Sequence, residues 1–213
     1  MKRLFLAVIA VITAIVLAVP AYAAESACPV GAPRDLALDF GERLSVPPVL
    51  IGCLRAPHLG RREVIAYRER IPRAGNLLCV DIVFADGSSG NCRPPNQRVH
   101  GADLSGGGTP DGALMFHGFA SRWAARISLR YWAHGRLKRQ TAAVVRVTDL
   151  GVLDRLGTSQ PIAYYAVAAT DQGRDALLLA RNKRRKLIWW RSIGHLADVF
   201  SGGSMLGELK LPS

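Results

Sequence analysis

Acidic residues, methionines and late cysteines are scarce in this sequence of 213 residues. It contains 16 Asp and Glu against 28 Lys and Arg, only three Met, and no cysteine after residue 92. Aromatic residues make up 7% and charged residues 21%, beside 49% hydrophobic residues. This composition excludes a coiled coil, a collagen and a multispan membrane protein, and it is too apolar for a wholly disordered chain. The length suits one domain or two small ones.

The common motifs of enzyme active sites and metal centres are also missing. No G-x-S-x-G, S-x-x-K, C-x-x-C, H-x-x-x-H or H-E-x-x-H occurs, and the glycines at 106–108 precede neither a lysine nor a helix start. We expect a hydrogen-bonded structural role for His117 and solvent exposure for His134. The sequence therefore predicts no catalytic residue, no metal ligand and no cofactor.

The first 23 residues have the pattern of a signal peptide. Lys2 and Arg3 precede an apolar run from 4 to 19, Pro20 ends that run, and 21–23 read Ala-Tyr-Ala. Small residues at these spacings are what signal peptidase cleaves after, so we predict cleavage after residue 23 and an exported protein, secreted, periplasmic or attached to the envelope. The alternative is that the segment is retained as a membrane anchor.

Export changes the interpretation of the four cysteines. Cys28, Cys53, Cys79 and Cys92 are an even set in an oxidising compartment, which predicts two disulfides. Four cysteines allow three pairings. We favour Cys28–Cys53 with Cys79–Cys92, and the spacing alone leaves the connectivity open.

Most of the chain has the pattern of short β-strands separated by turns. The clearest strand is 77–84, in which apolar residues alternate, and the Asp86-Gly87 turn should return the chain to Cys92. With that turn, Asp81 would face Cys92 and Cys79 would lie diagonal to it. Further strands are expected in the segments 49–51, 62–70, 113–116, 127–132, 144–147, 162–170, 176–180 and 187–190.

This pattern predicts an all-β protein of two small β-sandwich modules. The turn-rich segment at 105–112 is the candidate boundary. We expect a disulfide-stapled module over 24–108 and a basic, immunoglobulin-like sandwich over 109–213, after the signal peptide 1–23. Whether the modules are separate domains or one continuous sandwich is left open by the sequence.

Several short segments resemble a family of exported proteins. They are Leu78-Cys79-Val80, Gly90-Asn91-Cys92, Gly118-Phe119-Ala120, the stretch 125–131, and Tyr165-Ala166-Val167-Ala168. In these segments the chain is similar to uncharacterised immunoglobulin-like β-sandwich proteins of high-GC actinobacteria. The resemblance implies a fold and an exported location, and it implies no activity.

Positive charge is concentrated in the second half of the chain. Residues 24–111 hold ten Lys and Arg and ten Asp and Glu, whereas residues 112–213 hold sixteen and six. The candidate anion-binding patch consists of Arg181, Lys183, Arg184, Arg185, Lys186 and Arg191. Such a run can contact an anionic partner, or it can be a solvated hairpin tip. Because Trp189 and Trp190 are adjacent in a strand, they must point to opposite faces.

These observations favour an exported, non-enzymatic binding or envelope-associated protein. Its expected partner is an anionic envelope polymer or a membrane surface, and an exported protein seldom meets nucleic acid. One alternative is an extracytoplasmic hydrolase with a site between the two modules that uses His100 or His117. Another is a structural subunit of a larger envelope assembly. The ligand, a protein partner and the oligomeric state are not specified by the sequence.

Overall fold

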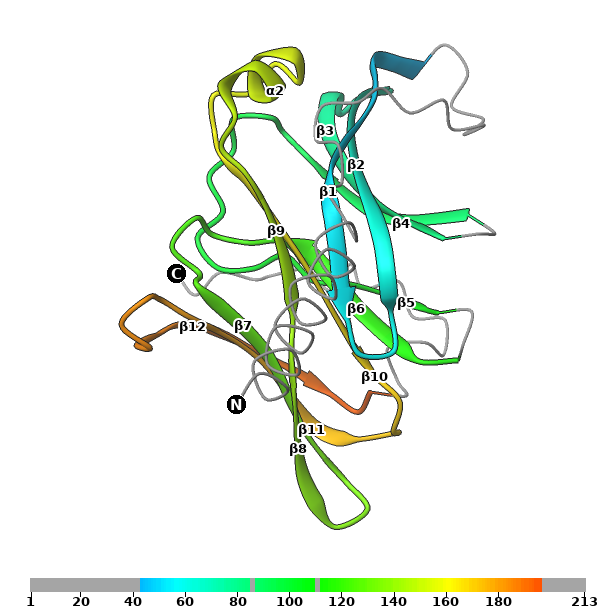
Figure 1. Cartoon of the computed structure of the whole chain (residues 1–213), viewed down its shortest axis with the longest axis vertical. Helices are drawn as coiled ribbons and strands as arrows, with labels where there is room; N and C mark the ends of the chain where they lie inside the picture. The colour runs from blue at the N-terminus through cyan, green and yellow to red at the C-terminus, as the bar shows by residue number, and fades with distance from the viewer. Residues whose placement is uncertain (1–42, 85–86, 110–111, 197–213) are drawn as a thin grey trace, which may run out of the picture.

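The protein is all-β, with three antiparallel sheets and one short helix in the part of the chain that the structure describes (Figure 1). The structure is a computed structural model that describes residues 43–84, 87–109 and 112–196. The predicted signal peptide and Cys28 lie outside these residues. No helix within the described ranges is long and apolar enough to cross a bilayer.

The first sheet is a meander of four strands in the order β1-β2-β3-β4. Its strands are β1 (Leu44–Ala56), β2 (Gly60–Ile71), β3 (Gly75–Phe84) and β4 (Gly87–Arg93). The strand expected at 49–51 is longer than predicted, because it continues through Pro47 and Pro48. The β1–β2 register shifts between Val46 and Val49, and β1 is an edge strand, where proline removes no ladder hydrogen bond that the sheet needs.

The hairpin of β3 and β4 confirms one predicted disulfide but corrects its register. Cys79 and Cys92 are bonded to each other and lie directly opposite, not diagonally. Asp81 therefore does not face Cys92. The pairing differs by two residues because residues 85–86 connect the strands, so the loop is not centred on Asp86-Gly87.

A close approach at Gly90 supports this register. Asp81 lies opposite Gly90, and a Cβ at residue 90 would overlap the Asp81 carboxylate. That carboxylate is 5% exposed and accepts a hydrogen bond from the Ser88 hydroxyl at 2.7 Å. Burial raises the pKa of Asp81, and its hydrogen bonds to Ser88 and Tyr67 oppose that rise. Glycine at position 90 thus makes room for a buried polar group.

The second sheet contains the most deeply buried strand. Its order is β5-β6-β10-β9, and its strands are β5 (Ser105–Gly108), β6 (Leu114–Phe119), β10 (Ile162–Ala169) and β9 (Ala143–Val147). Every residue of β10 is buried. Tyr164 and Tyr165 point to opposite faces, as predicted, and join different cores.

The third sheet has the order β12-β11-β7-β8 and carries much of the positive charge. Its strands are β12 (Leu187–Gly194), β11 (Arg174–Arg181), β7 (Arg126–Ala133) and β8 (Arg136–Thr141). The turn expected at His134-Gly135 joins β7 to β8, and both residues have positive φ. The sequence did not predict β8, because its polar composition hides the strand pattern.

The helix α2 (Leu150–Arg155) was also not predicted. It has six residues and follows β9. The Asp149 side chain accepts a hydrogen bond from the Val152 backbone N–H at 2.9 Å, as an N-cap residue does. Val152 and Leu153 pack into the first core, so the helix covers one end of it.

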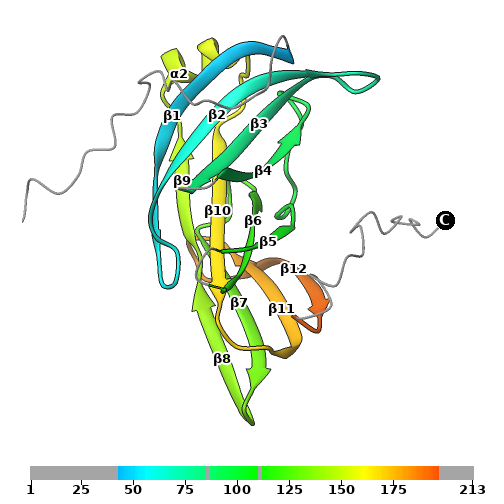
Figure 2. The same cartoon turned by 90° about the vertical axis from the view of Figure 1, so that its right-hand side faces the viewer.

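The three sheets are stacked with one large hydrophobic core in each of the two spaces between them (Figure 2). A smaller buried cluster of Leu50, Ile65, Tyr67 and Cys79 lies on the first sheet. The first core joins the first and second sheets, with members such as Val49, Leu78, Met115 and Tyr164. The second core joins the second and third sheets. The boundary expected after residue 108 falls between β5 and β6, which pair in one sheet. The first core also contains residues from both sides of that boundary, for example Leu78 and Met115.

The state of the cysteines indicates the kind of compartment in which this protein is found. The Cys79–Cys92 disulfide is buried on the Cys79 side, and no described cysteine is free. Such a bond indicates an oxidising, extracytoplasmic environment. Cys53 is also disulfide-bonded, while the predicted pairing with Cys28 involves a residue outside the described ranges.

We expect the double variant Cys79→Ala/Cys92→Ala to lose about 3 kcal/mol of unfolding free energy, because the bond closes a 13-residue span in the unfolded chain. Urea unfolding followed by tryptophan fluorescence measures this. An unchanged midpoint would show that the hairpin does not need the bond.

Candidate anion-binding surface

The third sheet has a cationic outer face. Arg126 and Arg130 occupy alternate positions of β7 and therefore share one face. Arg181 of β11 lies directly opposite Arg126, and Arg139 of β8 lies directly opposite Arg130. Two pairs of like charges thus stand side by side across three strands.

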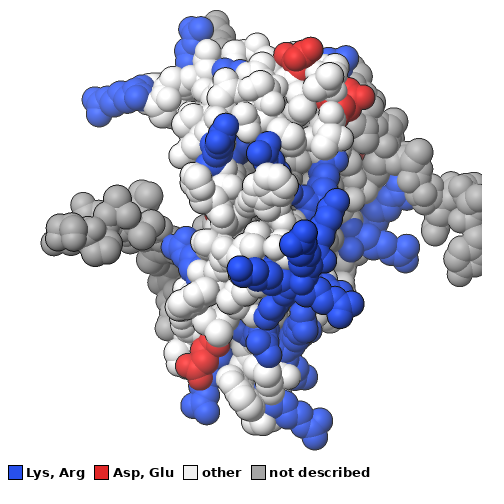
Figure 3. Space-filling view, turned by 90° about the vertical axis from the view of Figure 1, so that its left-hand side faces the viewer, with Lys and Arg blue, Asp and Glu red and all other residues white. Residues whose placement is uncertain are grey.

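This face is hollowed, and six of the nine described residues that line the hollow are cations. It has a volume of about 460 Å³. Its charged lining residues are Arg126, Arg130, Arg139, Arg181, Lys183 and Arg185. No Asp or Glu is among the described residues that line it. Figure 3 shows Lys and Arg side chains gathered in a band over this side of the molecule, with acidic side chains only near its upper and lower margins.

The turn between β11 and β12 is held by its own hydrogen bonds. The Asn182 backbone N–H donates a hydrogen bond to the Lys186 carbonyl. The Asn182 side-chain oxygen accepts one from the Lys186 backbone N–H at 3.0 Å. The Arg181 guanidinium donates to the Arg185 carbonyl at 3.0 Å. Arg185 has a φ of 61°, in the left-handed region. The cations of this turn are therefore presented from a defined backbone.

The predicted patch residues fall in three places. Arg181, Lys183 and Arg185 line the hollow of the third sheet. Lys183 and Arg184 line a second, adjoining hollow. Lys186 contributes backbone hydrogen bonds to the turn, and its side chain lines neither hollow. Arg191 lies apart, in a groove with Asp103 and the loop after β4.

The second hollow adds an exposed tryptophan to the cations. Its charged lining residues are Arg122, Arg146, Lys183 and Arg184, and Trp123 is 65% exposed there. The Arg122 guanidinium stacks on the Trp123 ring at 4.6 Å from its centroid. Because Lys183 lines both hollows, the cationic surface continues around the turn.

Sequence reasoning missed the residues that strand pairing contributes. Arg139 belongs to the basic run 136–139, which is part of the positive excess of the second half, but it was not included in the predicted patch. Arg130 lies in the predicted strand 127–132 and Arg126 directly precedes that strand, so their spacing of four residues was the available signal. Their alignment with Arg181 depends on the β7–β11 pairing, which links residues far apart in the chain.

The adjacent tryptophans face opposite sides, as expected. Trp189 lies opposite Ala180 and packs against the second core. A Cβ at Gly101 would overlap the Trp189 indole, so the loop after β4 covers it closely. Trp190 is 59% exposed on the other face.

Known proteins do not identify this surface. No family model, curated protein or solved structure matches the chain. Its chemistry therefore has to be inferred from its own residues.

A histidine, a serine and a tyrosine do come together, but inside the protein. The His117 ring is hydrogen-bonded to the Ser89 hydroxyl at 2.9 Å and to the Tyr164 hydroxyl at 2.7 Å. His117 is 1% exposed and Tyr164 is fully buried. Burial lowers the pKa of His117 to about 4, so the imidazole is neutral at pH 7. None of the hollows on the cationic surface reaches this network, so it serves to satisfy buried polar groups.

His100 is exposed and lines a hollow, but no carboxylate or serine among the described residues is hydrogen-bonded to its side chain. The group of possible metal ligands in the described ranges is Glu69 with Cys79 and Cys92, whose sulfurs are bonded to each other. Disulfide sulfurs are not thiolates and do not supply a zinc-type site.

The buried imidazole predicts acid sensitivity. The pKa of His117 is lower in the folded protein than in the unfolded chain, so its contribution to stability is complete above pH 6.5 and is lost as pH falls toward 4. The loss should be about 3 kcal/mol. Urea unfolding at several pH values measures it. His117→Asn should flatten this dependence and His100→Gln should keep it; equal profiles for the three proteins would contradict the assignment.

The facing arginines predict that the fold is strained by its own charge. Like charges directly opposite in a sheet are destabilising, so Arg139→Glu, which places an acid opposite Arg130, should raise the unfolding free energy by about 0.5 kcal/mol. Thermal unfolding at low salt measures this. The gain should shrink as salt screens the charges, and a salt-independent change would show another cause.

Proposed function

We propose that this protein is an exported, non-enzymatic binding protein, and that its cationic surface binds an anionic polymer of the cell envelope. In this proposal its sheets form two β-sandwich modules, the second immunoglobulin-like, as the resemblance implies. The observation that carries the proposal is the hollow on the third sheet, where six cations converge and no described lining residue is acidic.

The repulsion between facing arginines, which lowers the stability of the free protein, supports a binding role. Arg126 faces Arg181 and Arg130 faces Arg139, and none of these four forms an ion pair with another described residue. A solvated hairpin tip requires cations only in the turn. Facing arginines on strands that cross the sheet destabilise the free protein, and a bound polyanion would neutralise them.

The shape of the surface favours a linear polymer over a flat membrane. The two hollows share Ala125, Asn182 and Lys183, so together they form one continuous depression along the turn. A linear chain can follow both hollows, whereas a bilayer presents one plane. Trp123, exposed beside Arg122, offers an aromatic face on which a sugar ring can stack. An anionic polysaccharide supplies both the charges and the rings.

The predicted export of the protein limits the polyanions that it can meet. The signal-peptide pattern predicts secretion, and the disulfide indicates an oxidising compartment. Polymers of the envelope are the polyanions that an exported protein meets in quantity, which places them before nucleic acid.

The test is binding of the mature protein to dextran sulfate, with uncharged dextran as the control ligand. We expect binding to dextran sulfate alone, with an affinity that falls steeply as salt rises, because the polymer releases counterions on binding. The variant Arg126→Gln/Arg130→Gln/Arg139→Gln should bind about tenfold more weakly at low salt. Titration calorimetry at several salt concentrations measures both effects.

A matched variant removes the same charge from the first sheet. Arg55, Arg70 and Arg73 are exposed there, and Arg55→Gln/Arg70→Gln/Arg73→Gln should bind like the wild type. Equal losses in the two triple variants would show that net charge alone attracts the polymer and would overturn the proposed surface. Binding to vesicles containing phosphatidylglycerol, but not to dextran sulfate, would assign the surface to a membrane.

A further inference from the structure

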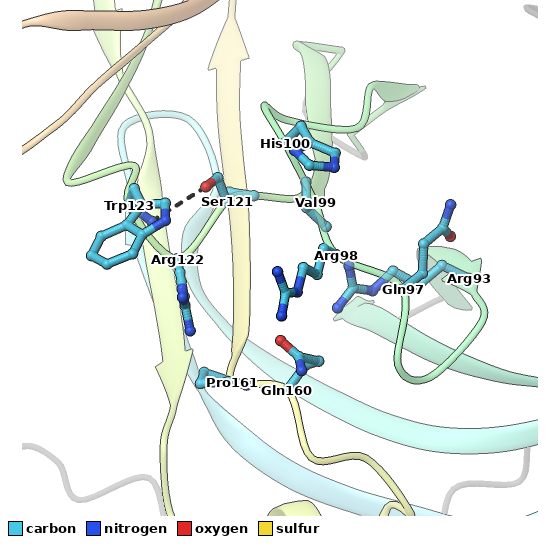
Figure 4. Close-up of a pocket in the computed structure, with 11 residues that line it drawn as sticks. Arg93, Gln97, Arg98, Val99, His100, Ser121, Arg122, Trp123, Gln160 and Pro161 are labelled. Carbon is cyan, nitrogen blue, oxygen red and sulfur yellow. Dashed lines mark hydrogen bonds between the residues drawn. The ribbon is translucent and has the colours of Figure 1, made fainter.

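A smaller cavity of about 170 Å³ lies beside the loop that follows β4. Three arginines, Arg93, Arg98 and Arg122, line it together with His100, and no Asp or Glu is among its described lining residues. Figure 4 shows Arg93 and Arg98 entering from one side with adjacent guanidinium groups, and Arg122 with Trp123 on the other side. Gln160 and Pro161 close its lower end in that view.

Arg93 is a buried cation without a hydrogen bond. It is only 6% exposed, and its Nε and Nη1 atoms are buried with no partner in the described structure. Its guanidinium lies over the Phe119 ring, 4.5 Å from the centroid. Asp103 is close enough to act on it electrostatically but forms no ion pair with it. The stacking fixes the position of the guanidinium group and leaves its Nε and Nη1 atoms without a described partner.

An unpaired buried guanidinium is costly to keep. Hydrogen bonds to charged groups are among the strong ones in proteins, and a buried ion that lacks them loses its hydration without compensation. Burial lowers the pKa of Arg93, which reflects the same desolvation. The described residues therefore supply no hydrogen-bond acceptor for Nε and Nη1 of Arg93.

The other two arginines are free to meet the same ligand. Arg98 is exposed and forms no hydrogen bond or ion pair with a described residue. Arg122 is exposed, and its guanidinium stacks on the Trp123 ring. Guanidinium groups bind phosphate, sulfate and carboxylate oxygens through two parallel hydrogen bonds. Three such groups suit a doubly charged oxyanion better than a singly charged one.

We propose that Arg93, Arg98 and Arg122 form a binding site for a single phosphate-type oxyanion. The site goes beyond the proposed polymer binding, because it is a discrete cavity with one buried cation and not an exposed face. Arg122 also lines the hollow that contains Lys183 and Arg184, so the site adjoins the cationic surface. The oxyanion is either a free small ion or a phosphate group carried by a larger ligand.

The first experiment is thermal unfolding of the mature protein in phosphate and in chloride at equal ionic strength. We expect phosphate to raise the Tm by about 3 °C at a concentration of about ten times its Kd, because a ligand that binds only the folded state stabilises it. Acetate should raise the Tm less than phosphate. Equal Tm values in phosphate and chloride would overturn the proposal.

Variants then separate a binding role from a packing role. Arg98→Gln/Arg122→Gln changes two exposed side chains and should abolish the phosphate-induced shift while leaving the Tm in chloride unchanged. Arg93→Met fills the same space without a charge, so its Tm in chloride should equal or exceed that of the wild type, with no phosphate shift. If Arg93→Met lowers the Tm in chloride and Arg98→Gln/Arg122→Gln keeps the phosphate shift, Arg93 is a structural residue and the proposal fails.

A control variant keeps this result independent of the proposed function. Arg139 lines the hollow of the third sheet and not this cavity. Arg139→Gln should keep the full phosphate shift even where it weakens polymer binding. Loss of the phosphate shift in Arg139→Gln would mean that the ion responds to overall charge, which also overturns the site. Arg98 lines this cavity and neither hollow of the cationic surface, so a phosphate-bearing polymer that binds Arg98→Gln more weakly than the wild type would identify the ion as a group of that polymer.

Discussion

Burial of the second sheet on both faces is the constraint on which this structure depends. All eight residues of β10 are buried, and alternate side chains enter two different cores, with Tyr164 in one and Tyr165 in the other. A strand buried on both sides needs a sheet against each face. The first sheet packs against one face of the second sheet and the third sheet packs against the other. The first sheet carries a further buried cluster of Leu50, Ile65, Tyr67 and Cys79 on its other face. The outer face of the third sheet, the turns and the loops are therefore left to carry function.

The third sheet shows how this constraint produces a cationic surface. In β7, Ile127, Leu129 and Tyr131 fill the second core, so positions 126, 128 and 130 lie on the opposite face of the sheet. Two of these are Arg126 and Arg130, and strand pairing aligns them with Arg181 and Arg139. Close cation pairs lower stability unless a counter-charge is bound, which connects the energetics of the sheet to its proposed ligand.

Two buried polar side chains, His117 and Arg93, differ in whether their hydrogen-bonding groups have partners. His117 is hydrogen-bonded on both ring nitrogens, to Ser89 and Tyr164, so it needs nothing from outside. Arg93 has a stacking partner but no hydrogen bond, and it lines a cavity with two further arginines. A satisfied group stabilises the interior, whereas an unsatisfied one beside a cavity indicates a ligand. This contrast, and not the residue types, separates the structural site from the candidate binding site.

Local patterns determined much of what the sequence could predict. Alternation identified β3 and β7, an apolar run ended by turn residues identified β10, and the even cysteine count led to the Cys79–Cys92 bond. The dense run at 181–186 drew attention to charge on one turn. Strand pairing decided the rest, because it joins positions that are separate in the chain. It set the register of the β3–β4 hairpin, which differs by two residues from the predicted one, and it added β8 to the third sheet. It also brought Arg126, Arg130 and Arg139 to the same face of the third sheet as the turn at 181–186. The cavity around Arg93 likewise exists only after a loop, β6 and the segment 121–123 pack together, since no local sequence signal specifies which buried charge will remain unpaired.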